Sequence, residues 1–86
     1  MILGMYSIYD KYTGYMVPAY QQSDEQARRM FAYDINHAEM SVIKVNPDDF
    51  QLEKVGTFDT DTGHVTVQKP EVIVTARQVL QRKDTE

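Results

Sequence analysis

The sequence predicts an α+β fold in which two antiparallel β-hairpins form a sheet packed on one central helix, with a short C-terminal strand and helix. Segments 9–15 and 58–64 share the pattern aromatic-Asp-x-x-Thr-Gly. In such loops the Asp accepts hydrogen bonds from backbone N–H groups, and the Gly supplies the positive φ that lets the chain reverse. Between these two hairpins, apolar residues recur at helical spacing.

Runs rich in aromatic and β-branched residues flank both loops and predict the strands 5–9, 15–20, 50–58 and 64–68. The helix is expected to begin at Ser23, which can cap it, with Gln26 as the partner of a capping box. It should end near residues 36–40. The apolar side of this helix consists of Ala27, Met30, Phe31, Ile35 and Ala38.

The rest of the chain gives weaker signals. Residues 41–45 are rich in β-branched side chains and predict a short strand, which Asn46 and Pro47 terminate. Residues 48–49 then form a turn or a single helical turn. After Pro70 a β-branched run at 72–74 precedes a helix over 76–83 that Thr75 can cap. We therefore expect a compact domain over 1–69 and a tail over 70–86.

Composition limits the classes of function. A chain of 86 residues with 42% hydrophobic residues has a thin core, and a homodimer would enlarge it. The absence of cysteine excludes disulfides, a thiolate nucleophile and sulfur-based zinc sites. We expect no signal peptide, no membrane segment and a cytoplasmic location. The net charge of −4 weighs against a polyanionic partner.

Candidate catalytic and metal sites are few. Asp59, Asp61 and Gly63 have the beginning of a calcium-loop spacing, but the glycine and glutamate that such a loop needs are misplaced, so a plain turn is the preferred interpretation. His37 and His64 are isolated and have no partner at a motif-like spacing. We therefore expect no enzymatic activity, no cofactor and no metal.

Tyrosine is the unusual feature of the composition, with six among nine aromatic residues. Alternation places Tyr6 and Ile8 on one side of the first strand and Met5, Ser7 and Tyr9 on the other. One helix can cover only one side, so the other must meet water, a second subunit or a ligand. Exposed tyrosines are a usable platform for stacking nucleic-acid bases. Tyrosines that only pack within the hairpin are the alternative.

Residues 46–52 (NPDDFQL), with GTFD at 56–59 and TG at 62–63, resemble the central signature of the small nonstructural protein of the gokushoviruses, which are Microviridae phages with circular single-stranded DNA. SIYD at 7–10 is similar to its opening hairpin, together with Tyr15 and Pro18. Asp24, Ala27, Arg29 and Phe31 are similar to its helix. The resemblance covers about residues 6–63 and implies a DNA-binding protein that acts when replication turns to single-strand synthesis. It transfers no DNA-contact residue.

The expected function is therefore binding of single-stranded DNA without sequence preference, in the cytoplasm of the bacterial host. Phosphate contacts need Lys and Arg, and base stacking needs exposed rings. The alternative is a non-catalytic interaction module that contacts a phage or host replication protein or a capsid protein. The candidate DNA-contact residues are Lys11, Tyr12, Tyr15, Arg28, Arg29, Arg77, Arg82 and Lys83.

Overall fold

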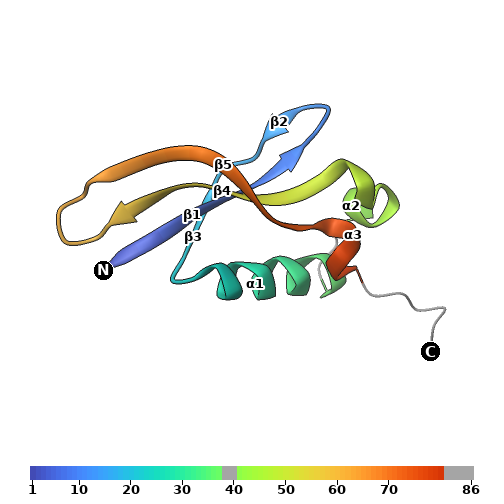
Figure 1. The fold of residues 1–86 in the computed structure, drawn as a ribbon. Coiled ribbons are helices and arrows are strands. Elements are labelled where there is room, and N and C mark those ends of the chain that lie inside the picture. Colours follow the sequence, from blue (N-terminus) through green and yellow to red (C-terminus); the bar gives the residue numbers. More distant parts are fainter. Residues whose placement is uncertain (38–40, 81–86) are drawn as a thin grey trace.

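The computed structural model describes residues 1–37 and 41–80. The elements in chain order are β1 (Ile2–Asp10), β2 (Gly14–Tyr15), β3 (Ala19–Gln21), α1 (Asp24–His37), α2 (Ser41–Val45), the 3-10 turn η1 (Pro47–Asp49), β4 (Phe50–Asp59), β5 (Val65–Thr75) and α3 (Ala76–Val79). The strands form one antiparallel sheet in the order β2-β1-β4-β5, and β3 pairs with β1 beside β2. The helix α1 lies along one side of this sheet (Figure 1). The predicted α+β class is confirmed.

Both predicted hairpin loops are confirmed. Gly14 has a φ of 98° and Gly63 a φ of 75°, and no other described residue has a positive φ. The side chain of Asp10 accepts a hydrogen bond from the backbone N–H of Tyr12 at 2.9 Å. Asp59 accepts one from the backbone N–H of Asp61 at 2.9 Å, which lowers the pKa of this carboxyl. Each aspartate therefore fixes its own loop, and each glycine closes it.

The strand predicted at 64–68 is longer in the structure, where β5 continues to Thr75. This continuation includes Pro70, although proline cannot donate to a strand ladder. Lys54 pairs with Glu71 and Gly56 with Val67, so three residues of β5 lie opposite one residue of β4. Pro70 lies in this bulge, where no ladder donor is required. The expected boundary at 69/70 thus falls inside a strand.

The single strand predicted at 15–20 is divided in two. Residues 16–18 separate β2 from β3, and Pro18 lies in this gap. The gap is held to β1 by two hydrogen bonds. The hydroxyl of Ser7 donates to the carbonyl oxygen of Met16 at 2.6 Å, and the N–H of Met16 donates to the carbonyl oxygen of Ile8 at 2.9 Å.

The strand predicted at 41–45 is wrong, because these residues form the helix α2. Ile43 is fully buried, whereas Val42 and Val45 are 57% and 73% exposed. A single inward residue flanked by exposed ones suits one helical turn better than a strand with a period of two. Packing of one isoleucine therefore outweighs the β propensity of the segment.

The core lies between α1 and the sheet. Ser23 caps α1 as predicted, because its Oγ accepts a hydrogen bond from the N–H of Gln26 at 3.1 Å. The predicted cap of α3 at Thr75 is also present, with Gln78 completing a capping box. Met30 was expected in the core but is 43% exposed. The buried hydrophobic residues are Tyr6, Ala27, Phe31, Ile35, Ile43, Phe50, Leu52, Val74 and Ala76.

A polar cluster joins the beginning of α1 to the sheet. The hydroxyl of Tyr6 donates to Asp24 Oδ1 at 2.5 Å, and Lys54 Nζ lies 3.5 Å from the same oxygen. The hydrogen bond from Tyr6 is the main reason why the pKa of the Asp24 carboxyl is lowered. Burial and this bond raise the pKa of the Tyr6 phenol.

This cluster predicts a loss of stability in acid. Because the folded state lowers the pKa of Asp24 below its ordinary value of 3.8, the contribution of this carboxylate to stability is fully present above that pH and is lost as the pH falls through the pKa of the folded state. Asp24→Asn should therefore lower the melting temperature at pH 7, and the difference from the wild type should shrink in acid. Thermal unfolding between neutral pH and pH about 2.5 measures this. Asp34→Asn, on the same helix, is the control, and a pH-independent difference for Asp24→Asn would contradict the account.

Candidate nucleic-acid interface

The sheet has a covered side and an open side. Tyr6 and Ile8 lie on the side of the sheet that packs toward α1, and Met5, Ser7 and Tyr9 lie on the opposite side. No helix of the described residues lies over that opposite side (Figure 1). We call it the open face.

One aromatic pair occupies the end of the open face next to β2. Tyr9 and Tyr15 are cross-strand neighbours whose ring centroids lie 4.8 Å apart. The hydroxyl of Tyr15 donates to Glu53 Oε1 at 2.7 Å, and Gln51 Nε2 donates to Glu53 Oε2 at 2.5 Å. The bond to Glu53 raises the pKa of the Tyr15 phenol. The ring of Tyr15 is 50% exposed and is held in place by the hydrogen bond of its own hydroxyl.

A second aromatic pair lies further along the open face. The ring centroids of Tyr20 and Phe58 are 5.9 Å apart, and Tyr20 is 49% exposed. Tyr20 pairs with Met5 along one edge of β1, and Phe58 pairs with Leu3 along the other edge. Neither ring was among the predicted contacts. The side on which Phe58 lies depends on Val55, which is unpaired in the β1–β4 register and shifts the alternation of β4, and the side on which Tyr20 lies depends on the pairing of β3 with β1.

Three of the predicted contacts lie together at the β1–β2 hairpin, namely Lys11, Tyr12 and Tyr15. Tyr12 is 77% exposed in the loop, and Lys11 Nζ lies 5.6 Å from the centroid of its ring. Lys11 Nζ is also 3.2 Å from Asp49 Oδ1, which raises the pKa of the lysine. A phosphate would have to compete with this carboxylate for Lys11.

Arg77 is likewise paired. Its Nε and Nη2 donate to the two carboxylate oxygens of Asp48 at 2.5 and 3.0 Å. This bidentate contact lowers the pKa of the Asp48 carboxyl. The other two predicted tail contacts, Arg82 and Lys83, lie outside the described residues.

Arg28 and Arg29 are on α1, beyond the covered side of the sheet, so the structure separates them from the hairpin residues. Arg29 lines a shallow pocket with Gln26, Met30 and Tyr33. Tyr33 is 57% exposed and stacks on the ring of His37 at 4.3 Å. Among the described residues, the predicted contacts on α1 therefore lie apart from those at the β1–β2 hairpin.

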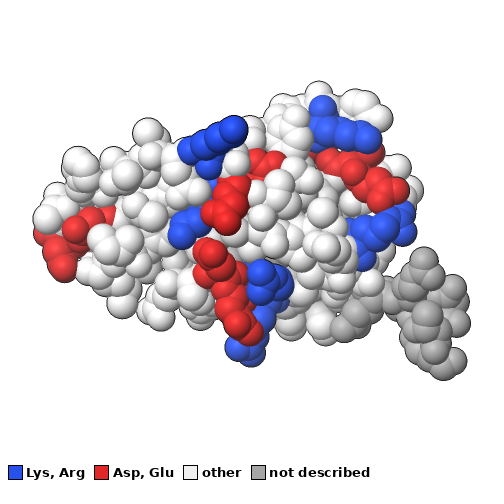
Figure 2. Space-filling view, in the orientation of Figure 1, with Lys and Arg blue, Asp and Glu red and all other residues white. Residues whose placement is uncertain are grey.

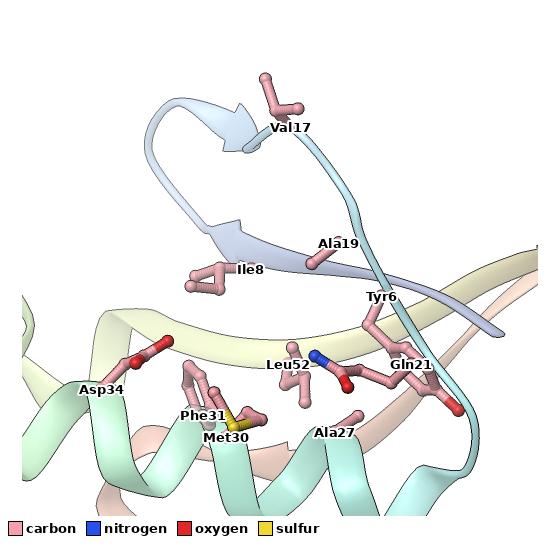
Figure 3. A pocket seen from close by; sticks show the side chains of 10 residues that line it. All are labelled: Tyr6, Ile8, Val17, Ala19, Gln21, Ala27, Met30, Phe31, Asp34 and Leu52. Carbon is pink, nitrogen blue, oxygen red and sulfur yellow. The ribbon is translucent and has the colours of Figure 1, made fainter. Parts of the chain in front are cut away.

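A second pocket, of about 120 Å³, lies between α1 and segment 17–21. Its volume is close to that of a single large side chain. Asp34 and Gln21 supply its polar groups, and Val17 points away from it (Figure 3). The pocket lies on the covered side and is separate from both aromatic pairs. The remaining lining residues are Tyr6, Ile8, Ala19, Ala27, Met30, Phe31 and Leu52.

Opposite charges alternate along the surface and leave no broad basic patch in the view of Figure 2. Over residues 1–37 and 41–80, the cations without a carboxylate within 4 Å are Arg28, Arg29, Lys44 and Lys69. The same residues contain no group of three or more His, Asp or Glu side chains placed to hold a metal ion. None of the helices in the described part of the chain is long and apolar enough to cross a membrane.

Together, the fold and the open face define a small α+β protein that presents aromatic pairs on a side of the sheet that no helix of the described residues covers. Residues 3–79 match the protein family described as Phage ORF5 protein. The match extends from β1 to α3, so the chain belongs to this family and is a phage protein. Comparison with curated proteins and with solved structures gave no match.

Proposed function

We propose that this phage protein binds single-stranded DNA through its open face and catalyses no reaction. The supporting observation is the Tyr9–Tyr15 pair, in which a half-exposed ring is held in place on the open face. Stacking of one base on such a ring contributes about 1–3 kcal/mol and tolerates any base. The resemblance to the gokushovirus nonstructural protein supports a role in genome replication in the cytoplasm of the bacterial host.

Stacking contributes more to this binding than phosphate contacts do. Lys11 is engaged by Asp49, and Arg77 is engaged by Asp48, so each must exchange a carboxylate for a phosphate. Arg28 and Arg29 lie beyond the other side of the sheet and do not contact a strand bound to the open face. For a single strand, each neutralised phosphate steepens the decrease of log affinity with log salt concentration by about 0.7. With one or two phosphate contacts, the dependence on salt is shallow.

The wild-type protein tests this directly. Fluorescence anisotropy of a labelled oligothymidylate, and of the same strand in a duplex, should show tighter binding of the single strand. Between about 50 and about 200 mM salt the affinity should fall by less than roughly tenfold. Equal affinity for strand and duplex would contradict stacking. A steep salt dependence would indicate that Arg28 and Arg29 contact the phosphates instead.

A protein-interaction module is the second candidate function, and one observation favours it. Val65, Val67 and Val72 are 49%, 83% and 50% exposed, and their register places them on the open face. Exposed apolar patches are typical of surfaces that contact other proteins. No binding of either oligonucleotide at low salt would favour this function.

A further inference from the structure

The hairpin of β4 and β5 extends past α1 as an arm, alongside the first residues of β1 (Figure 1). One side of this arm continues the open face. The apolar residues on this side of the arm, together with Tyr20 of the neighbouring strand β3, form what we call the arm surface: Leu3, Met5, Tyr20, Phe58, Val65 and Val67. The register connects them, because Leu3 pairs with Phe58 and Phe58 with Val65, while Met5 pairs with Tyr20 and Gly56, and Gly56 with Val67.

The two sides of the arm differ in polarity. Thr57 pairs with Thr66, so both threonines lie on the side opposite the arm surface. A strand that alternates in this way normally turns its apolar residues toward a partner and its polar residues toward water. Yet Val67 is 83% exposed, and no described element covers it. The alternation therefore indicates a partner other than residues 1–37 and 41–80 of the same chain.

The chemistry of the arm surface selects a second copy of this chain as that partner. None of its six residues is charged, although 26% of the whole chain is. A partner chosen by charge would find nothing to pair with here. Two copies with a net charge of −4 each repel one another, and contact through an uncharged surface limits this repulsion. A two-fold axis lets the same apolar surface pack on itself.

We infer that the arm surface is the interface of a homodimer, in which the arms of two copies pack face to face as two aligned sheets. Tyr9 and Tyr15 lie at the other end of the open face and do not belong to the interface. The inference therefore does not depend on DNA binding. It can be tested in the absence of any oligonucleotide, and its failure would leave the proposed function standing.

Sedimentation velocity on the full chain at micromolar concentrations tests the dimer. The wild type should sediment at about 20 kDa, twice the 10.0 kDa of one chain. Val67→Glu places a charge in the interface and should weaken dimerisation roughly hundredfold or more, leaving a folded monomer. Val67 is exposed in the single chain, so circular dichroism should show unchanged folding.

Thr66→Glu is the matched control, because it introduces the same charge at the next residue of β5 but on the opposite side. This variant should remain a dimer. A wild-type monomer at high micromolar concentration would overturn the inference. Dissociation by Thr66→Glu with retention of the dimer in Val67→Glu would also overturn it, and so would a dimer that neither substitution affects. If Val67→Glu fails to fold, Val65→Glu replaces it, with the same expected result.

Discussion

Gly56→Ala is expected to lower the free energy of unfolding by about 2 kcal/mol or more, which is a large part of the stability of a chain this small. A Cβ atom at position 56 would lie 2.6 Å from the carbonyl oxygen of Thr66. This oxygen belongs to the backbone of β5, so no side-chain rotation relieves the contact. The two strands of the arm would have to separate at the bulge.

Gly14→Ala is the control for this substitution. A Cβ atom there meets nothing within 4 Å, but the φ of 98° strains any residue other than glycine. Its expected cost is about 1 kcal/mol, from backbone strain alone. Urea unfolding monitored by circular dichroism compares the two variants. If Gly56→Ala costs no more than Gly14→Ala, then β4 and β5 do not approach as closely as the structure places them.

Tyr15→Ala is expected to weaken binding of single-stranded DNA by roughly 5-fold to 150-fold, which corresponds to the loss of one stacked base. The substitution also leaves Glu53 without the hydroxyl that Tyr15 donates. Tyr15→Phe retains the ring and loses only this hydrogen bond, so it should weaken binding clearly less than Tyr15→Ala does. Anisotropy titrations with the labelled oligothymidylate measure all three proteins.

Tyr33→Ala is the matched control for Tyr15→Ala. Tyr33 is 57% exposed, close to the 50% of Tyr15, but it lies on α1 and not on the open face. Its removal should leave the affinity for single strands unchanged. The opposite pattern, with a loss in Tyr33→Ala and none in Tyr15→Ala, would assign binding to the helix, where Arg29 lies close by.

Local signals predicted the parts of the fold that short-range chemistry determines. The Asp-x-x-Thr-Gly pattern gave both loops with the correct glycine conformation, and Ser23 gave the beginning of α1. The errors arose in segments whose secondary structure depends on packing against residues distant in the sequence. A bulge accommodates Pro70 within β5, and burial of Ile43 turns a β-branched segment into a helix. Neither effect can be derived from propensity, because both depend on neighbours that are distant along the chain.

For the candidate site, the sequence predicted which residues of β1 share a side of the sheet, but not which cations pair with carboxylates. Alternation in β1 correctly separated Tyr6 from Tyr9. The partners of Lys11 and Arg77 were not predictable, because Asp49 and Asp48 are 38 and 29 positions away in the sequence. The sequence also could not show that Arg28 and Arg29 lie across the sheet from Tyr15, since this depends on which side α1 covers.

Mapping of DNA contacts by NMR tests the central claim, that the open face binds the strand, most directly. Titration of the labelled wild-type protein with an unlabelled oligothymidylate should shift the backbone amide signals of Ser7, Tyr9, Tyr15, Gln51 and Glu53 most. The amides of α1 around Arg28, Arg29 and Tyr33 should remain nearly unchanged. Shifts concentrated on α1 would contradict the claim, and so would a complete absence of shifts at saturating oligonucleotide.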